Sequence, residues 1–387
     1  MKFAHLGDCH LGGWRQPELK ELNFKSFQIA LERAVKENVE FILIAGDLFD
    51  AAYPPIETLK QTFEEFRKLK ERNIPVFLIA GSHDYSVSGK TFLDVLEKAG
   101  FCKNVSNFEE RNEKIMLLPT VYKNVAIYGY PGKKSGLEVD DIEKIKLQDS
   151  PGLFKILMLH TTIKGAIGNI PMKAVDETKL PAANYTALAH LHINYNKNGK
   201  VYSGPIFPNN LSELEELKYG TFYIYDNGTP KRQEIKLAEV ISIKYETKDS
   251  LDATEKIRSL LQKEDLKGKI VIVRVSGILE KGKISDIDFP KLERFAKDNG
   301  AIVFLKSTSK LHVAESETES KILDSENIES DLIDQFKEKN PNKFNHLIPT
   351  MLKFLQVEKL EDETQSAFED RLLADSMRII EDEIQKD

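Results

Sequence analysis

The amino-acid sequence predicts an α/β fold in which two sheets pack on each other as a sandwich flanked by helices. Over the first 100 residues, short unbroken apolar runs alternate with segments whose apolar residues recur at helical spacing. Unbroken apolar runs are typical of strands that are covered on both faces. After residue 114, strand-like runs follow one another and helical patterns become scarce, which indicates a second sheet with some antiparallel order.

The elements of this first domain can be assigned in order along the chain. Strands are expected at residues 2–7, 41–45 and 76–80, and helices over residues 24–39 and around Phe63, Phe66 and Leu69. The strands of the second sheet are expected at residues 114–130, 154–160, 185–190, 201–207 and 222–225. We place the end of the domain at residue 231, so that it covers residues 1–231.

Three further regions follow the sandwich. Residues 232–313 alternate strand-like and helical segments, which predicts a small α+β capping domain. Residues 314–327 are polar and rich in Glu and Ser, as is typical of a linker. Residues 328–387 carry apolar stripes at helical spacing, so we expect helices there. Such stripes are commonly intramolecular core, but a segment this short favours docking onto another chain.

Composition excludes several classes of protein. The chain has 387 residues, of which 41% are hydrophobic and 30% charged, as is typical of a globular protein with more than one domain. It has no run of about 20 apolar residues, so no membrane-spanning helix is expected. Only Cys9 and Cys102 occur, which excludes a disulfide scaffold and a cysteine-based zinc ribbon. The N-terminus enters a strand pattern without a signal sequence, so a cytoplasmic location is expected.

Charge is distributed unevenly along the chain. The net charge of -7 divides into -11 over residues 315–387 and +4 over the residues before them. A mildly basic body with an acidic tail is one pattern of nucleic-acid-binding or assembling proteins. Two differently solvated regions explain it equally well, so charge alone decides nothing about function.

Five polar motifs lie at the ends of predicted strands. They are, in chain order, Asp8-Cys9-His10, Gly46-Asp47-Leu48-Phe49-Asp50, Gly81-Ser82-His83-Asp84, His160 and His190-Leu191-His192. Ligands of open α/β sheets bind outside the carboxyl ends of the strands, so these motifs should meet in one crevice. Each motif alone has an ordinary structural explanation, such as a turn or a satisfied core histidine. Their joint occurrence at successive strand ends favours a functional site.

The residue types indicate a pair of divalent cations. Carboxylates and neutral imidazoles are the ligands of Mn, Fe or Zn in proteins. A single carboxylate, Asp47, can bridge two such ions at the separation of about 3.5–4 Å that serves phosphoester hydrolysis. His83 resembles a general acid whose imidazole is fixed by the adjacent Asp84.

The order of these motifs resembles the calcineurin-like metallophosphoesterase superfamily. Residues 3–12 and 46–50 resemble its Mre-eleven/SbcD family in particular, and the resemblance covers roughly residues 1–230. That family is the nuclease subunit of a DNA double-strand-break repair complex whose partner is an SMC-like coiled-coil ATPase of the Rad-fifty/SbcC type. The resemblance implies a metallophosphoesterase sandwich, a capping domain and a helical ATPase-binding region at the C-terminus.

The resemblance also implies roles for individual residues and a cofactor of two Mn²⁺ ions per subunit. The implied ligands are Asp8, His10, Asp47 and His192 for one metal, and Asp47, Ser82, His160 and His190 for the other. The family normally has Asn where Ser82 stands, and a serine hydroxyl is a poorer donor, so the second metal is expected to bind more weakly. His83, with Asp84 beside it, occupies the position of the family's catalytic imidazole.

Contacts to DNA are expected from basic residues on loops near the motifs. The candidates are Arg15, Lys133, Lys134 and Lys197, with Trp14 and Lys200 close to them in sequence. An ordinary solvated side chain explains any one of the lysines as well. No helix-turn-helix, zinc-finger or RNA-binding signature is present, so contacts to the phosphate backbone are expected.

The motifs and the resemblance together predict a two-metal DNA nuclease that works as a homodimer on DNA ends. The implied activities are 3′ to 5′ exonuclease on double strands and endonuclease on single strands. One alternative is another calcineurin-like phosphoesterase that acts on small phosphodiesters. A second alternative is a non-catalytic DNA-end clamp, which would follow if Ser82 had lost the second metal.

Overall fold

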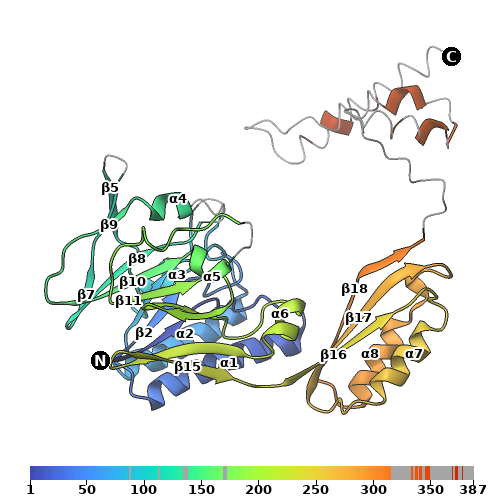
Figure 1. Ribbon diagram of the computed structural model, residues 1–387, viewed down its shortest axis with the longest axis horizontal. Helices are drawn as coiled ribbons and strands as arrows, with labels where there is room; N and C mark the ends of the chain where they lie inside the picture. Colours follow the sequence, from blue (N-terminus) through green and yellow to red (C-terminus); the bar gives the residue numbers. More distant parts are fainter. Residues whose placement is uncertain are drawn as a thin grey trace. The chain divides into compact units, whose positions relative to one another are not determined.

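A computed structural model describes residues 1–86, 89–111, 114–133, 138–168 and 172–314, and beyond these only scattered residues between 333 and 377. Met1–Val313 form one compact unit and Ala314–Asp387 a second (Figure 1). The linker and most of the helical region expected after residue 314 lie outside the described residues and stay predictions. Within the described part of the chain, no helix is long and apolar enough to cross a membrane.

The first sheet has six strands in the order β15-β14-β1-β2-β3-β4. Strands β1 to β4 are parallel, and β14 and β15 extend the sheet in antiparallel fashion. The strand bounds are β1 Lys2–Leu6, β2 Phe41–Ala45, β3 Val76–Ile79, β4 Lys103–Asn104, β14 Gly220–Asp226 and β15 Thr229–Ile235. The parallel strands are connected by helices α1 (Pro17–Lys36), α2 (Ile56–Glu71) and α3 (Leu93–Lys98).

The second sheet has the order β12-β13-β11-β10-β8-β7, with parallel central strands and antiparallel edges. Its bounds are β7 Thr120–Tyr122, β8 Val125–Tyr130, β10 Phe154–His160, β11 Tyr185–Ala189, β12 Asn194–Lys197 and β13 Lys200–Ser203. A small third sheet contains β5 (Phe108–Arg111), β6 (Lys114–Leu117) and β9 (Ile145–Leu147). Short helices are α4 (Glu138–Ile142), α5 (Lys164–Ile167) and α6 (Leu211–Glu216). The predicted α/β fold with two main sheets is confirmed.

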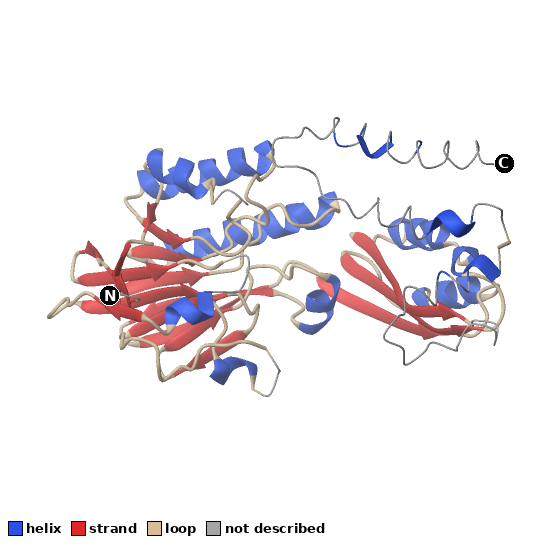
Figure 2. Ribbon diagram, turned by 90° about the horizontal axis from the view of Figure 1, so that it is seen from above, coloured by secondary structure: helices blue, strands red, loops and turns tan. Residues whose placement is uncertain are grey.

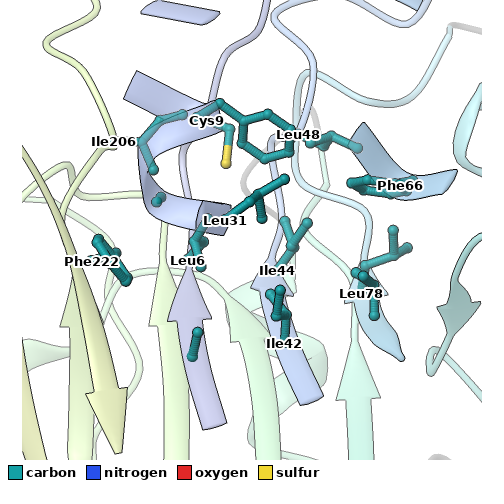
Figure 3. Close-up of a cluster of buried hydrophobic side chains, with 14 of the residues drawn as sticks. Leu6, Cys9, Leu31, Ile42, Ile44, Leu48, Phe66, Leu78, Ile206 and Phe222 are labelled. Atoms are coloured by element: carbon teal, nitrogen blue, oxygen red, sulfur yellow. The ribbon is translucent and has the colours of Figure 1, made fainter. Parts of the chain in front are cut away.

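One apolar layer lies between the first sheet and its helices. Leu6, Ile44 and Leu78 of the strands share a buried cluster with Leu31 of α1 and Phe66 of α2 (Figure 3). Figure 2 shows the two long helices lying along one face of the strands. Burial of these side chains explains why the strand sequences are apolar without interruption.

Helix α1 begins earlier and ends sooner than the predicted range of 24–39. Pro17 stands in the first turn, where its missing N–H costs nothing, and Leu19 is buried. At the other end, Asn38 adopts a φ of 55°, a left-handed conformation that reverses the chain after Lys36. The boundaries were thus set by turn chemistry rather than by apolar spacing.

A second apolar layer lies between the two sheets. The Phe3 ring stacks on Phe41 and Tyr225 with centroid distances of 5.0 and 4.6 Å, and meets Tyr185 edge-on at 5.1 Å. Phe3 and Phe41 belong to the first sheet and Tyr185 to the second, so this aromatic cluster joins the sheets.

The remaining part of the compact unit is a β-α-β-α-β domain with parallel strand order β16-β17-β18. Its elements are β16 Glu239–Glu246, α7 Ala253–Leu261, β17 Lys269–Leu279, α8 Phe289–Asp298 and β18 Val303–Val313. Helices α7 and α8 pack on one face of this sheet (Figure 1). The other face contributes Ile270, Ile272 and Leu305 to a cluster with Trp14 of the sandwich. We call this part the capping domain below.

We expect Phe3→Ala to lower the free energy of unfolding by about 3–5 kcal/mol, because it removes a fully buried ring and leaves a cavity. Chemical denaturation followed by tryptophan fluorescence and circular dichroism measures this loss. Val121→Ala is the control, since Val121 is 57% exposed and its truncation should change stability by less than about 0.5 kcal/mol. Equal losses in the two variants would contradict the role given to the aromatic cluster.

Candidate metal centre

The predicted ligands come from strand ends in both main sheets. In the first sheet they follow β1, β2 and β3; in the second, His160 is the last residue of β10, and His190 and His192 follow β11. A continuous set of side-chain and backbone contacts joins them at one end of the sandwich. The residues brought together are Asp8, His10, Asp47, Ser82, His160, His190 and His192.

Asp47 lies at the middle of this group. Its Oδ2 atom is 3.1 Å from His160 Nε2 and 3.7 Å from His10 Nε2. Among the described residues, three groups have all donor atoms within 4.8 Å of one another: Asp8, His10 and His192; Asp8, Asp47 and His160; and His10, Asp50 and His83. The first two contain only predicted ligands. These clusters share Asp8, while Asp47 reaches an imidazole of each, so either carboxylate is within range of both clusters.

Three imidazoles are oriented in the same way. His10 Nδ1 lies 3.0 Å from Asp50 Oδ1, and His192 Nδ1 lies 2.9 Å from Glu213 Oε1. His160 Nδ1 lies 3.1 Å from the carbonyl oxygen of Ala45. Each of these oxygens accepts a hydrogen bond, so each Nδ1 carries the proton and Nε2 faces the cluster. Metal-bound histidines are typically held in this way by an oxygen on the far ring nitrogen.

His190 contacts the group differently. Its backbone N–H donates to both carboxylate oxygens of Asp8, at 2.9 and 3.0 Å. Its ring atom Nδ1 lies 3.3 Å from His160 Nε2, and His10 Nε2 lies 3.0 Å from His192 Nε2. Ring nitrogens that face each other this closely must share a proton or a cation. The donor set of imidazoles and carboxylates therefore fits divalent cations.

The backbone is strained at these positions. Asp8, His10, Asp47 and His192 have φ values between 44° and 52°, and His190 has 106°. L residues rarely adopt positive φ, and Asp and His tolerate it better than most. Such strain persists only where the surrounding structure enforces it, and it clusters at functional sites.

Two glycines make room for the cluster. A Cβ on Gly46 would lie 2.4 Å from His160 Nδ1, and a Cβ on Gly81 would lie 2.2 Å from Asp47 Oδ1. Gly46 also has a φ of 100°. Any side chain at either position would displace a candidate ligand.

Ser82 and His83 lie on the loop after β3. Ser82 Oγ is 3.4 Å from Asp47 Oδ2, a long hydrogen bond, and the His83 N–H donates to Asp47 Oδ1 at 2.8 Å. The His83 side chain is 47% exposed, and its Nδ1 lies 2.8 Å from the carbonyl oxygen of Asp50. Its ring meets that of His10 edge-on with centroids 4.8 Å apart.

Asp84 does not hold the His83 ring in the way that the sequence predicts. Its buried carboxylate accepts hydrogen bonds from the backbone N–H groups of Gly81, Phe49 and Leu48, at 2.9, 3.0 and 3.3 Å. It therefore ties the loop after β3 to the loop after β2. The prediction failed because neighbouring residues in a tight turn point in different directions. The carbonyl of Asp50 takes the place expected for Asp84.

Charge interactions within the cluster shift several pKa values. Burial opposes ionisation of Asp47, but the charges and hydrogen bonds of His160 outweigh it and lower the pKa. Burial alone would lower the pKa of His160, yet Asp47 raises it to about 9. Burial would also lower the pKa of His192, but Asp8 and Glu213 raise this pKa to about 9. Burial and the neighbouring His160 lower the pKa of His190 to about 4.

Cys9 lies between two candidate ligands but faces the opposite way. Its thiol is fully buried in the apolar layer beside Leu6 and Leu31 (Figure 3). Burial raises the pKa of the thiol well above its usual value. Cys9 is thus a core residue and no part of the donor set.

The basic residues predicted to contact DNA differ in their surroundings. Arg15 and Lys197 are exposed, while Lys133 forms an ion pair with Asp141 at 2.5 Å. Lys134 lies outside the described residues. Trp14 is buried, and its indole N–H donates to the carbonyl oxygen of Pro208 at 2.9 Å, so it serves packing.

Two orienting carboxylates were not selected from the sequence. Asp50 stands in the second motif without an assigned role, and Glu213 follows no motif. A signal for Glu213 does exist, because Asn210-Leu211-Ser212-Glu213 has the spacing of a helix capping box. In the structure the Asn210 side chain accepts from the Glu213 N–H at 3.0 Å.

The geometry indicates a site for divalent cations, and comparison with known proteins gives the class of enzyme to which such a site belongs. Residues 1–194 match the family of calcineurin-like phosphoesterases, and the chain belongs to that family. It is therefore a metal-dependent hydrolase of phosphoester bonds, as predicted.

The chain is also similar to individual named proteins. It is similar to the DNA double-strand break repair protein Mre11 of Archaeoglobus fulgidus, with 27% identity over 320 residues, 74% of this chain and 71% of that protein. The Mre11 protein of Methanosarcina acetivorans is 26% identical over 78% of this chain and 49% of its own length. The uncharacterized metallophosphoesterase YhaO of Bacillus subtilis is 30% identical over 50% of this chain and 48% of its own. The resemblance to the Mre-eleven/SbcD family is confirmed.

We expect metal affinity to rise with pH between about pH 6 and about pH 9, because His160 and His192 must lose protons to offer Nε2. The increase is roughly tenfold per pH unit for each imidazole that is deprotonated. Calorimetric titration of metal-free protein with Mn²⁺ in buffers of different ionisation enthalpy measures the protons released. An affinity that is constant over this range would contradict the assigned protonation states.

Proposed function

We propose that the protein is a two-metal nuclease that hydrolyses phosphodiester bonds of DNA ends during double-strand-break repair. The observation that carries this proposal is the set of three imidazoles, His10, His160 and His192, whose Nε2 atoms face Asp8 and Asp47. The similarity to proteins named for DNA double-strand break repair supports the choice of DNA as substrate. The proposed cofactor is a pair of Mn²⁺ ions.

When bound, the two ions would be held by the ligand sets that the family resemblance implies, and Asp47 would contribute to both sets. Asp47 suits this role because its Oδ2 lies near both His10 and His160. Cations held there would supply Lewis-acid charge and would lower the pKa of a water molecule. The chain itself contributes fixed donor atoms, since Asp8, Asp47 and His160 are buried and each side chain is held by a hydrogen bond with a backbone group. Ser82, whose hydroxyl lies 3.4 Å from Asp47 Oδ2, would be the weakest of the proposed ligands of the second ion.

His83 is the proposed general acid. The carbonyl oxygen of Asp50 can only accept, so the nearby Nδ1 of His83 carries a proton. Nε2 is therefore the nitrogen that gains or loses a proton, and the exposed ring can meet a substrate. A protonated His83 would donate from Nε2 to the leaving oxygen of the phosphodiester.

DNA, an ATPase subunit and a second copy of the chain are the proposed partners. Exposed Arg15 and Lys197 offer positive charge for the phosphate backbone, and paired Lys133 offers less. Tyr53 and Ile56, three residues apart in the chain, are 66% and 77% exposed, and such large exposed apolar side chains are the proposed contribution to a protein contact such as a homodimer. The C-terminal helical region is the proposed binding site for an SMC-like ATPase.

Cleavage of DNA in parallel with a small phosphodiester tests the proposed function. Linear double-stranded DNA, single-stranded circles and bis-nitrophenyl phosphate should each be incubated with the full chain, with and without Mn²⁺. We expect Mn²⁺-dependent shortening of double strands from 3′ ends and cutting of the circles. Hydrolysis of the small ester alone would indicate a different phosphoesterase, and DNA binding without cleavage would indicate a clamp.

We expect His83→Ala to slow DNA cleavage by about 10²–10⁴-fold while metal content stays unchanged, since the residue supplies a proton rather than a ligand. Elemental analysis of the purified variant measures the metal. His312→Ala is the matched control, because His312 is an exposed histidine of β18. Loss of metal together with activity would make His83 a ligand instead.

Removal of the residues after Val313 should leave basal nuclease activity and abolish binding of the ATPase subunit. The reason is that Met1–Val313 form one compact unit that contains every candidate ligand. Co-purification with the ATPase subunit measures binding. A shortened chain that still binds the subunit would refute the assignment of the C-terminal region.

A further inference from the structure

Helix α6 places three consecutive side chains in three different environments. Glu213 accepts the hydrogen bond from His192 Nδ1 at 2.9 Å. Leu214 is buried in the cluster that the sandwich and the capping domain share. Glu215 Oε2 lies 2.6 Å from both Nε and Nη2 of Arg274 on β17. A single helical turn therefore touches the metal centre on one side and the capping sheet on the other.

The beginning of α6 is tied to the metal centre a second time. Glu213 Oε2 accepts from the Asn209 N–H at 2.8 Å, and the Asn210 side chain caps the helix. Asn209 Nδ2 in turn donates to Asp50 Oδ1 at 3.3 Å, the same oxygen that holds His10. The segment thus carries or supports the orienting carboxylates of two candidate ligands.

On the side of the capping domain, Arg274 contacts Glu215 through two nitrogens. Arg274 contacts Glu215 Oε2 through both Nε and Nη2. Its Nη2 also lies 3.2 Å from Ser212 Oγ. Ser242 of β16 donates to the other oxygen of Glu215. The two charged side chains are only 26% and 17% exposed. A guanidinium that contacts a carboxylate through two nitrogens fixes geometry better than a lysine does.

The length of α6 makes these contacts decisive. The helix has six residues, and isolated helices shorter than about 12 residues are marginal in water. Its position must therefore come from what its side chains touch. Loss of the Arg274 contact would remove one of the contacts that position the turn carrying Glu213, beside the burial of Leu214 and the Asn210 cap.

We propose that Arg274 is a positioning residue of the metal centre. Through Glu215 and the short α6 helix it holds Glu213, and Glu213 holds the His192 imidazole with Nε2 toward the metal site. The inference rests on the proposed function, because it requires that His192 bind a metal. It makes the capping domain part of what shapes the metal centre.

Titration of the full chain with Mn²⁺ tests the inference. We expect Arg274→Ala to weaken Mn²⁺ binding by roughly threefold to tenfold, and Arg274→Lys to recover part of this loss because it keeps the charge. The ring ¹⁵N signals of His192 should change in Arg274→Ala. Glu215→Gln, which keeps the shape of the side chain, carries the same expectation should Arg274→Ala fold poorly.

Lys297→Ala is the matched control. Lys297 on α8 also pairs with the sandwich, at 3.7 Å from Glu18 of α1, but makes no contact with α6 among those of the described residues. Its removal should leave Mn²⁺ affinity unchanged. An equal loss in this variant would mean that any loosening of the capping domain weakens the site, and would overturn the specific role of Arg274.

A double variant shows whether Arg274 affects Mn²⁺ affinity through Glu213 or through a general loosening of the protein. In a Glu213→Ala background, which removes the acceptor for His192 Nδ1, Arg274→Ala should cause no further loss of Mn²⁺ affinity, because both changes act on the same contact. Fully additive losses, or unchanged affinity in Arg274→Ala, would overturn the inference while leaving the proposed function intact. A wild-type chain that bound no Mn²⁺ would overturn both.

Discussion

The contact between Asp47 and His160 is the constraint on which the rest of the site depends. Asp47 follows β2 of the first sheet, and His160 ends β10 of the second. The imidazole meets the carboxylate with Nε2 and the carbonyl of Ala45 with Nδ1, so one side chain joins the two sheets twice. Either charge left alone at this depth would cost several kcal/mol, which keeps the ends of these two strands together.

The sequence predicted the strands and most of the cluster because both are local signals. A strand ends where its apolar run ends, so Asp8, Asp47 and His160 could be placed at strand exits without knowledge of the packing. The orienting roles of Asp50 and Glu213 could not be predicted from the sequence. They depend on contacts between segments that lie far apart in the chain. The direction of the Asp84 carboxylate likewise depends on the turn that carries it.

The strained backbone and the tightly packed glycines both serve to hold the donor atoms in fixed positions. Positive φ at Asp8, His10, Asp47 and His192 places successive strand ends in conformations that a free peptide avoids. The two apolar layers supply the stability that offsets this strain, since they bury the strands that lead into Asp8 and Asp47. Donor atoms held before the ions arrive need little rearrangement when they bind.

The inward orientation of Cys9 has a consequence for which elements the centre accepts. A sulfur ligand beside Asp8 and His10 would favour zinc or monovalent copper over harder ions. With that sulfur kept protonated inside the apolar layer, the first loop offers only oxygen and nitrogen. The centre consequently lacks the soft donor that would retain thiophilic metals, and the abundance of each ion in the cell weighs more heavily in deciding which one is bound.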